Sequence, residues 1–509
     1  MKLYHILMVM PMILPIVSCE SMIADKAKAS MDNQMVFLFR PDEGKAVSRC
    51  IISGRVLKDG SGIEGVTVTV TGGDGANVTV ITDREGRYIA LLPSPGNYTV
   101  TPSGQRYRMY PPARDLAVEG RASDVDFMAG ASLWWRTYGT GLEERAFSAC
   151  ATSDGGYLLA GYGYSLRSGS FSRDGRMVKI DSGGNVIWDR YYGGCGEEEI
   201  RSIIETTAHN YAAAGYTSSR GHGGKDAWLI IIDRDGNVVS NREHVFGGAG
   251  DDRANSLIQG SMGELVLTGV TETETAEEDA YAVGISEAGS VLFEKSYGGG
   301  GNDRGSAVIE ACPGVYFVAG HGRPDGSGDM DSWAFMIDGS GNILSVSGSS
   351  PGWSRFYGRP GEDTFDTAIK DVAGGFILGG YSTDRDKGRV RARMMRIDSR
   401  GSVVWDCNDV NGGGDDEAIN GMCITPEGIF AVGKTSSNNF YGNPLVIRVG
   451  FEGGGLERKT IVNPGDGEAF SIVPGCDGTY LVTGYMKNDY SASIDFWAVN
   501  ADVFFRFNK

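Results

Sequence analysis

The sequence predicts an all-β protein in which a small β-sandwich precedes a larger domain of seven repeated four-stranded units. Gly accounts for 77 of the 509 residues but lacks the three-residue period of collagen, and 41% of residues are apolar, which is enough for sizeable cores. Short segments of alternating apolar and polar residues are separated by turn signals. From about residue 130 onward, one pattern recurs about every 54 residues.

The charge balance is acidic, with 47 Lys and Arg residues against 65 Asp and Glu residues and a net charge of −18. A surface that binds nucleic acid needs cationic side chains to contact phosphates, so we expect no nucleic acid partner. Beyond the N-terminus no apolar run reaches 18 residues, and we expect no membrane-spanning segment there.

Residues 1–19 have the pattern of an export signal. Lys2 precedes an apolar stretch over residues 6–17, which Pro11 and Pro15 interrupt, and the small residue Ser18 precedes Cys19. Because this stretch is too short and too interrupted for a membrane span, we interpret it as a signal peptide. Residues 20–49 are polar without a clear period, and we expect them to form a tether.

The sequence Ile16-Val17-Ser18-Cys19 resembles the lipobox of bacterial lipoproteins. The resemblance implies cleavage before Cys19, acylation at this residue, and a membrane partner reached through the lipid. It also implies an exported protein of the bacterial cell envelope, at the outer membrane or the cell surface. Two or three acyl chains anchor stably, whereas one is marginal. An ordinary secretory signal with a coincidental Cys is the alternative.

Residues 50–129 have the sequence pattern of a small β-sandwich. Alternating segments at 52–56, 66–70, 88–92 and 98–101 are separated by turn signals, and residues 125–127 can supply a last strand. The motif order G-x-V, G-I-E-G-V-x-V, T-D-x-E-G-x-Y and L-P-x-G-x-Y-x-V resembles the carboxypeptidase regulatory-like domain, a transthyretin-like fold. Relatives mostly serve as spacers, stabilisers or weak binding modules, so the resemblance implies little about function.

Residues 130–509 contain seven repeats. In each repeat, one residue opens a glycine-rich turn. A glycine that ends an apolar run always follows it 23 residues later. The glycines are Gly161, Gly215, Gly269, Gly320, Gly380, Gly433 and Gly484. The turn-opening residues are Tyr138, Tyr192, Phe246, Tyr297, Tyr357, Val410 and Ile461.

Each repeat contains four predicted strands. Examples are the first strand at 254–259, the second at 265–268 and the third at 227–232 or 332–337, followed by a fourth that can hold an aromatic residue. Seven such units resemble a seven-bladed β-propeller, in which every repeat is one blade. A solenoid is the alternative, but neither terminus carries a polar capping repeat.

Residues 133–138 repeat the fourth-strand pattern before the first blade begins. We expect this segment to pair in the last blade, which would close the ring and remove an exposed edge. A second aromatic segment at 503–507 competes for the same position. The motifs Y-G-G-x-G-x-D and D-G-G-Y-x-x-x-G resemble those of secreted bacterial propeller proteins over residues 132–509.

Two columns of residues are candidates for a ligand site. One holds an acid six residues after the turn opener, and the other holds an aromatic residue directly after the repeat glycine. Propeller topology places both on the same face, where carboxylates and tyrosine rings suit the hydroxyls and C–H faces of sugars. The candidates are Glu144, Glu198, Asp252, Asp303, Asp363, Asp416, Tyr162, Tyr216, Tyr381 and Tyr485.

Both columns also have a structural interpretation. The acids can be turn carboxylates that accept backbone N–H groups, and the tyrosines can pack over glycines between blades. A cation in the acidic ring is a further possibility.

No catalytic residue, metal site or cofactor can be assigned from motifs. The histidines form no HExxH motif, and no G-x-S-x-G or phosphate-binding loop occurs. We therefore expect a lipoprotein whose propeller is a binding scaffold for an extracellular glycan or protein. The alternative is an exported enzyme acting on polysaccharide, which needs only two carboxylates at a defined separation.

Overall fold

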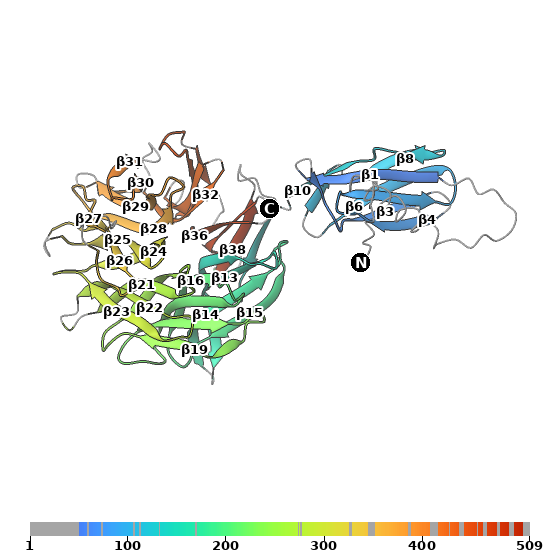
Figure 1. Ribbon diagram of the computed structural model, residues 1–509. Helices are drawn as coiled ribbons and strands as arrows, with labels where there is room; N and C mark the ends of the chain where they lie inside the picture. The colour runs from blue at the N-terminus through green and yellow to red at the C-terminus, as the bar shows by residue number, and fades with distance from the viewer. Residues whose placement is uncertain are drawn as a thin grey trace, which may run out of the picture.

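The computed structural model describes residues 50–58, 61–72, 75–104, 107–110, 113–131, 133–167, 170–272, 274, 277–324, 328–344, 352–384, 388–407, 416–426, 428–436, 442–455, 457–461, 466–475, 479–487 and 493–501. The predicted signal peptide, Cys19, the tether and the segment 503–507 lie outside these residues. Figure 1 shows a small body of strands and a ring of sheets, with β10 ending the first and β11 beginning the second.

The first body is a sandwich of two sheets. In one, β1 pairs with β2, β5, β9 and β10, and β7 lies beyond β10; the other has the order β4-β3-β6-β8. Their inner faces bury Ile52, Val68, Tyr98, Val100 and Phe127 in one core. The strands are β1 (Cys50–Lys58), β2 (Ser61–Gly62), β3 (Thr67–Gly72), β4 (Ala76–Ile81), β5 (Arg87–Leu92), β6 (Gly96–Ser103), β7 (Tyr107–Tyr110), β8 (Arg114–Val118), β9 (Arg121–Ala122) and β10 (Phe127–Ala131).

The predicted sandwich strands are present as β1, β3, β5 and β6, because alternating Val and Thr residues place one apolar face toward the core. The last strand, predicted at 125–127, instead begins at Phe127 as β10. Val125 precedes it and accepts a hydrogen bond from the Tyr88 hydroxyl through its backbone oxygen at 2.6 Å. The short strands β4, β7 and β8 complete the two sheets.

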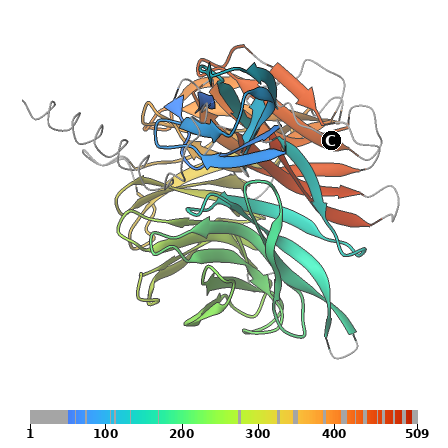
Figure 2. The same ribbon diagram turned by 90° about the vertical axis from the view of Figure 1, so that its right-hand side faces the viewer.

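The second body consists of seven four-stranded antiparallel sheets, so the predicted seven-bladed propeller is confirmed. Figure 2, turned by 90°, shows the twist of these sheets. Blades 1 to 4 consist of β12 (Arg145–Ala151), β13 (Tyr157–Arg167), β14 (Ser170–Ile180), β15 (Val186–Tyr192), β16 (Glu198–Glu205), β17 (Tyr211–Thr217), β18 (Asp226–Ile232), β19 (Val238–Phe246), β20 (Arg253–Gln259), β21 (Leu265–Glu272), β22 (Glu278–Ile285), β23 (Val291–Tyr297), β24 (Arg304–Cys312), β25 (Val315–Gly322), β26 (Asp331–Asp338) and β27 (Ser354–Phe356).

Blades 5 and 6 have the same strand order as the first four, and blade 7 takes its fourth strand from the start of the propeller. Their strands are β28 (Asp363–Lys370), β29 (Phe376–Asp384), β30 (Arg389–Ile397), β31 (Val403–Cys407), β32 (Glu417–Thr425), β33 (Gly428–Thr435), β34 (Asn443–Val449), β35 (Glu457–Thr460), β36 (Gly467–Pro474), β37 (Tyr480–Lys487), β38 (Ile494–Ala501) and β11 (Trp134–Tyr138).

Closure of the ring by residues 134–138 is confirmed. Strand β11 pairs antiparallel with β38, from Trp134 opposite Asn500 to Tyr138 opposite Phe496. Chain ends far apart in sequence therefore share one sheet, and the edge of β38 is covered.

Aromatic residues in or beside the fourth strands of blades 1, 3, 4, 5 and 7 attach each of these blades to the next. The Tyr192 hydroxyl donates to the Gly236 carbonyl at 2.8 Å, and the Trp188 indole N–H donates to the Arg234 carbonyl at 3.0 Å. Tyr138 and Trp134 of the closing strand make equivalent bonds to Gly184 and Ser182. The recurring turn-opening tyrosine is thus an inter-blade contact.

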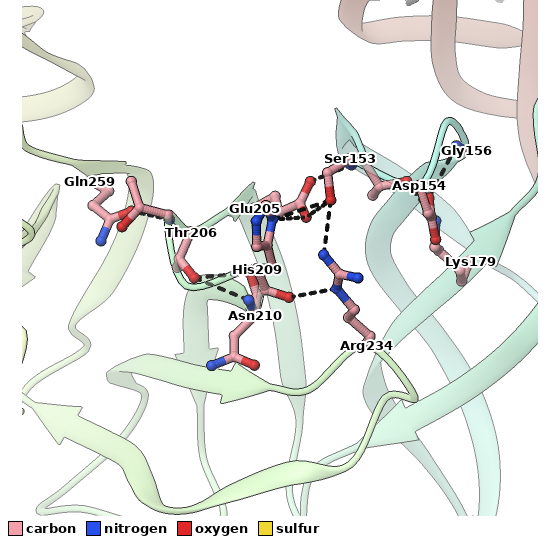
Figure 3. Close-up of polar contacts among 12 residues, drawn as sticks. Ser153, Asp154, Gly156, Lys179, Glu205, Thr206, His209, Asn210, Arg234 and Gln259 are labelled. Atoms are coloured by element: carbon pink, nitrogen blue, oxygen red, sulfur yellow. Dashed lines mark hydrogen bonds and ion pairs between the residues drawn. The ribbon is translucent and has the colours of Figure 1, made fainter.

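Further inter-blade contacts lie at the same end of the blades, at the turns after the innermost strands. Figure 3 shows the turn residue Ser153 of blade 1 beside Glu205 of blade 2, whose carboxylate accepts the Ser153 N–H at 2.6 Å. Glu205 also contacts His209, and Arg234 donates to the Ser153 hydroxyl at 3.1 Å. These bonds hold neighbouring blades together at the end opposite the candidate residues.

The innermost strands each contain a β-bulge opposite the repeat glycine. In blade 2, for example, the pairing shifts between Ile200 and Ser202. A Cβ on Gly215 would lie 1.8 Å from the Glu199 carbonyl oxygen, so only glycine fits there. This close approach is the physical reason for the glycine column, and the bulge turns one residue of every inner strand outward from the ladder.

Candidate functional site

The loops that join successive blades and the loops between the second and third strands lie on one face, as predicted. The Ser218 N–H donates to the Glu197 carbonyl at 2.8 Å within a blade, and the Asp303 N–H donates to the Glu278 carbonyl at 2.6 Å between blades. We call this the site face.

The acid column does not form an exposed ring on the site face. Five of its members are buried and accept the backbone N–H of the residue four positions earlier in the same loop, and burial raises the pKa of Glu144, Asp252 and Asp303. Structure therefore favours the turn role for Glu144, Glu198, Asp252, Asp303 and Asp363.

Asp416, the sixth acid, is not equivalent to the others. Strand β32 pairs Ile419 with Gly433, one residue closer in sequence than the corresponding pair Ile200 and Gly215. The shorter turn shifts the register by one, so Glu417 takes the column position and is buried against Arg458. Asp416 is exposed and accepts the Val390 N–H at 3.0 Å.

Three of the four candidate tyrosines are buried under cationic side chains. The guanidinium of Arg173 lies 4.2 Å from the Tyr162 ring centre, and that of Arg145 lies 4.2 Å from the Tyr485 ring. The Lys225 ammonium lies 4.8 Å from the Tyr216 ring. Tyr162, Tyr216 and Tyr485 therefore present covered faces.

Tyr381, the fourth candidate, is partly exposed and lines a pocket between blades 5 and 6. The pocket has a volume of about 630 Å³, and Asp416 lies on its wall. The polar side chains in its lining include Glu362, Asp366, Tyr381, Asn420, Lys434 and Glu468. Tyr381 and Asp416 are the two of the ten candidate binding residues that line this pocket.

The bulged residues of all seven inner strands line a second cavity of about 180 Å³ on the propeller axis. Asp366 and Asn420 line both spaces, so the axial cavity and the blade 5–6 pocket adjoin at these two residues. The bulged residues are Phe147, Arg201, Asn255, Ser306, Asp366, Asn420 and Phe470.

Asp366 is the residue at the junction of the two cavities. Burial raises its pKa, while Arg304 and a hydrogen bond from the Thr364 hydroxyl at 3.0 Å act in the opposite direction and Glu468 adds to the increase. Glu468 accepts the Asn420 amide at 2.9 Å and the Tyr485 hydroxyl at 3.3 Å. The junction thus offers acceptor and donor groups fixed by their neighbours.

Sequence reasoning missed the bulged residues because they share no chemistry from blade to blade. Their signal is positional: each lies 14 residues before the repeat glycine, or 13 in blade 6. Within the described ranges, no three His, Cys, Asp or Glu side chains are arranged to hold a metal ion, and no helix is long and apolar enough to cross a bilayer.

Comparison with known proteins agrees with the two-domain architecture. Residues 51–129 match the carboxypeptidase regulatory-like domain family, as the motifs predict. No curated protein sequence matches the chain.

Solved structures with similar folds are distant from this chain. Sqt1 from Chaetomium thermophilum has 10% identity and a TM-score of 0.40, covering 72% of this chain and 98% of its own. The WD40 domain of Pan2 from Neurospora crassa has 7% identity and a TM-score of 0.38, covering 73% and 94%. A Hadza microbial sialidase has 8% identity and a TM-score of 0.40, covering 91% and 95%. At these distances the matches carry no argument about function.

Proposed function

We propose that this chain is a bacterial cell-envelope lipoprotein, acylated at Cys19, whose propeller binds an extracellular glycan in the blade 5–6 pocket. The sandwich domain serves as a spacer. One observation carries the proposal: a partly exposed tyrosine, carboxylates, an amide and an ammonium group converge in one recess.

The chemistry of this recess suits a sugar. Tyr381 supplies an aromatic ring, Asp366 and Glu468 accept hydrogen bonds from hydroxyls, and Lys434 donates to them. The volume of about 630 Å³ lies within the roughly 300–1,000 Å³ of small-molecule sites. A protein partner would more often meet a broad surface with a central apolar anchor, whereas charged and amide side chains line this recess.

A glycan array with the mature protein tests the proposal. Tyr381→Ala and Asp366→Asn should each weaken binding of the selected glycan at least tenfold, whereas Tyr164→Ala, at a half-buried tyrosine outside the pocket, should leave it unchanged. Unchanged binding in both pocket variants would contradict the site. A peptide array run in parallel would show a protein ligand instead.

An enzyme acting on polysaccharide is the second candidate, favoured by one specific observation. Two carboxylates from different blades, Asp366 and Glu468, line the same pocket, and burial raises the pKa of Asp366. A pair of carboxylates at a defined separation is what glycoside hydrolysis requires. Release of reducing ends by the wild type, abolished in Asp366→Asn and Glu468→Gln, would establish this function; no release would leave the protein a binder.

A further inference from the structure

Among the described residues, Arg304 in the axial cavity forms no ion pair, although the Asp366 carboxylate of the same cavity interacts with its charge. Its guanidinium donates through Nη2 to Asn255 Oδ1 at 3.2 Å, but among the described residues no acid forms an ion pair with it. Its Nε is buried and unpaired with any acceptor. Removing a charge from water in this way costs free energy unless a counter-charge or hydrogen bonds compensate for it.

Two further polar atoms near Arg304 also lack partners. The Ser306 hydroxyl lines the same cavity, and the ring nitrogen Nδ1 of His321 lies on the strand opposite Arg304; both atoms are buried without a hydrogen bond. Unsatisfied buried polar atoms are rare in folded proteins and indicate a missing partner.

The equivalent residue of the preceding blade shows that this arrangement is specific to blade 4. Arg253 occupies the same column position and forms ion pairs with Asp251 at 2.8 Å and Glu278 at 3.6 Å. Arg201, the other arginine in the axial cavity, forms an ion pair with Glu199. Arg304 is the one of these three arginines that forms no ion pair with a described acid.

The size of the axial cavity limits what that anion can be. Its volume of about 180 Å³ is below the roughly 300–1,000 Å³ of small-molecule sites, so it suits a carboxylate group rather than a sugar chain. Arg304 lies in this cavity, and the adjoining pocket, which shares Asp366 and Asn420 with it, is large enough for the ring that carries the carboxylate.

We infer that the glycan bound by this protein contains a uronic acid, whose carboxylate reaches the axial cavity. The Arg304 guanidinium and the Ser306 hydroxyl bind the carboxylate, while Asp366 and Asn420 bind hydroxyls of the same sugar. The inference rests on the proposed function, because it specifies which glycans the blade 5–6 pocket selects. A guanidinium is suited to this task because its N–H groups match a carboxylate in geometry.

The test compares acidic glycans on an array with the same glycans after chemical reduction of their carboxyl groups to alcohols. Wild-type protein should bind the acidic forms at least tenfold more tightly. Arg304→Gln should bind both forms equally, whereas the matched control Arg253→Gln should keep the preference. Ser306→Ala, which removes only one hydroxyl, should reduce the preference and serves if Arg304→Gln fails to fold.

Melting temperature adds a readout that a structural role for Arg304 would not give. Because Arg304 forms no ion pair, its loss should leave the melting temperature of the free protein unchanged or raise it. Equal binding of acidic and reduced glycans by the wild type, or a preference retained in Arg304→Gln, would overturn the inference and leave the proposed function intact. Binding of no glycan in either form would overturn the proposed function itself.

Discussion

Single carboxylates of the acid column stabilise their own turns. Glu417 and Asp416 are neighbours in sequence, yet Glu417 is buried beside Arg458 and Asp416 is exposed. Buried carboxylates must keep their hydrogen-bond partners, because an unsatisfied buried group costs about 1–3 kcal/mol. Turn geometry therefore explains why an acid recurs at this position of the repeat. The proposed binding site in the blade 5–6 pocket uses residues that differ from blade to blade.

The neighbouring pair gives a direct prediction. Glu417→Ala removes a buried carboxylate together with its bond to the more exposed Arg458, and should lower the free energy of unfolding by about 1–3 kcal/mol. Asp416→Ala, the matched control, should change it by less than about 1 kcal/mol, because an exposed acid contributes little. Urea denaturation of both variants measures the difference. Equal costs would show that the register assigned to blade 6 is incorrect.

His321 makes stability depend on pH. Burial, and secondarily the charge of Arg304, lowers its pKa to about 4 from an ordinary value of 6.5. The unfolded chain therefore takes up a proton at this residue near pH 6.5 while the folded chain stays neutral until about pH 4. The stability due to the neutral ring is present above pH 6.5 and is lost as pH falls toward 4.

Unfolding free energies measured between pH 7.5 and 4.5 test this prediction. The wild type should lose more stability over that range than His321→Gln, which has no proton to bind. Parallel pH profiles for the two proteins would mean that His321 titrates normally in the folded state.

At the scale of strands, the closing segment should carry much of the propeller's stability. Strand β11 covers the edge of β38, and Trp134 and Tyr138 also donate to the turn of blade 1 at 2.8 and 3.0 Å. Deletion of residues 132–138 breaks both contacts and should lower stability by several kcal/mol, a large share of what a domain has. An unchanged melting temperature would show that another segment closes the ring.

The spacing between the turn-opening residue and the glycine predicts the strands well, because each of these residues has a structural role that recurs among the blades. Tyr192 donates across a blade interface, and Gly215 faces a carbonyl too close for any side chain. The site is different: Ser306, Asp366 and Asn420 occupy one structural position with unrelated chemistries. A pattern based on residue type cannot detect them, and the one-residue shortening in blade 6 also moved the alignment from Glu417 to Asp416.

For the whole molecule, the lipid anchor predicts where the protein is found. Cys19→Ser removes the thiol that would be acylated, so the variant should leave the membrane fraction and accumulate uncleaved or in soluble form. Cell fractionation with immunoblotting measures this, and substitution of Cys50, which is buried in the sandwich core, controls for general loss of a cysteine. A variant that stays membrane-bound and is still cleaved would contradict acylation at Cys19.

The binding proposal depends on the place where the axial cavity adjoins the blade 5–6 pocket, because Asp366 and Asn420 line both. A crystal structure of the mature protein with the glycan selected on the array tests it most directly. The account predicts sugar density against Tyr381, Asn420 and Lys434, with a carboxylate beside Arg304. Density confined to the sandwich domain, or to the outer strands of the blades, would contradict it.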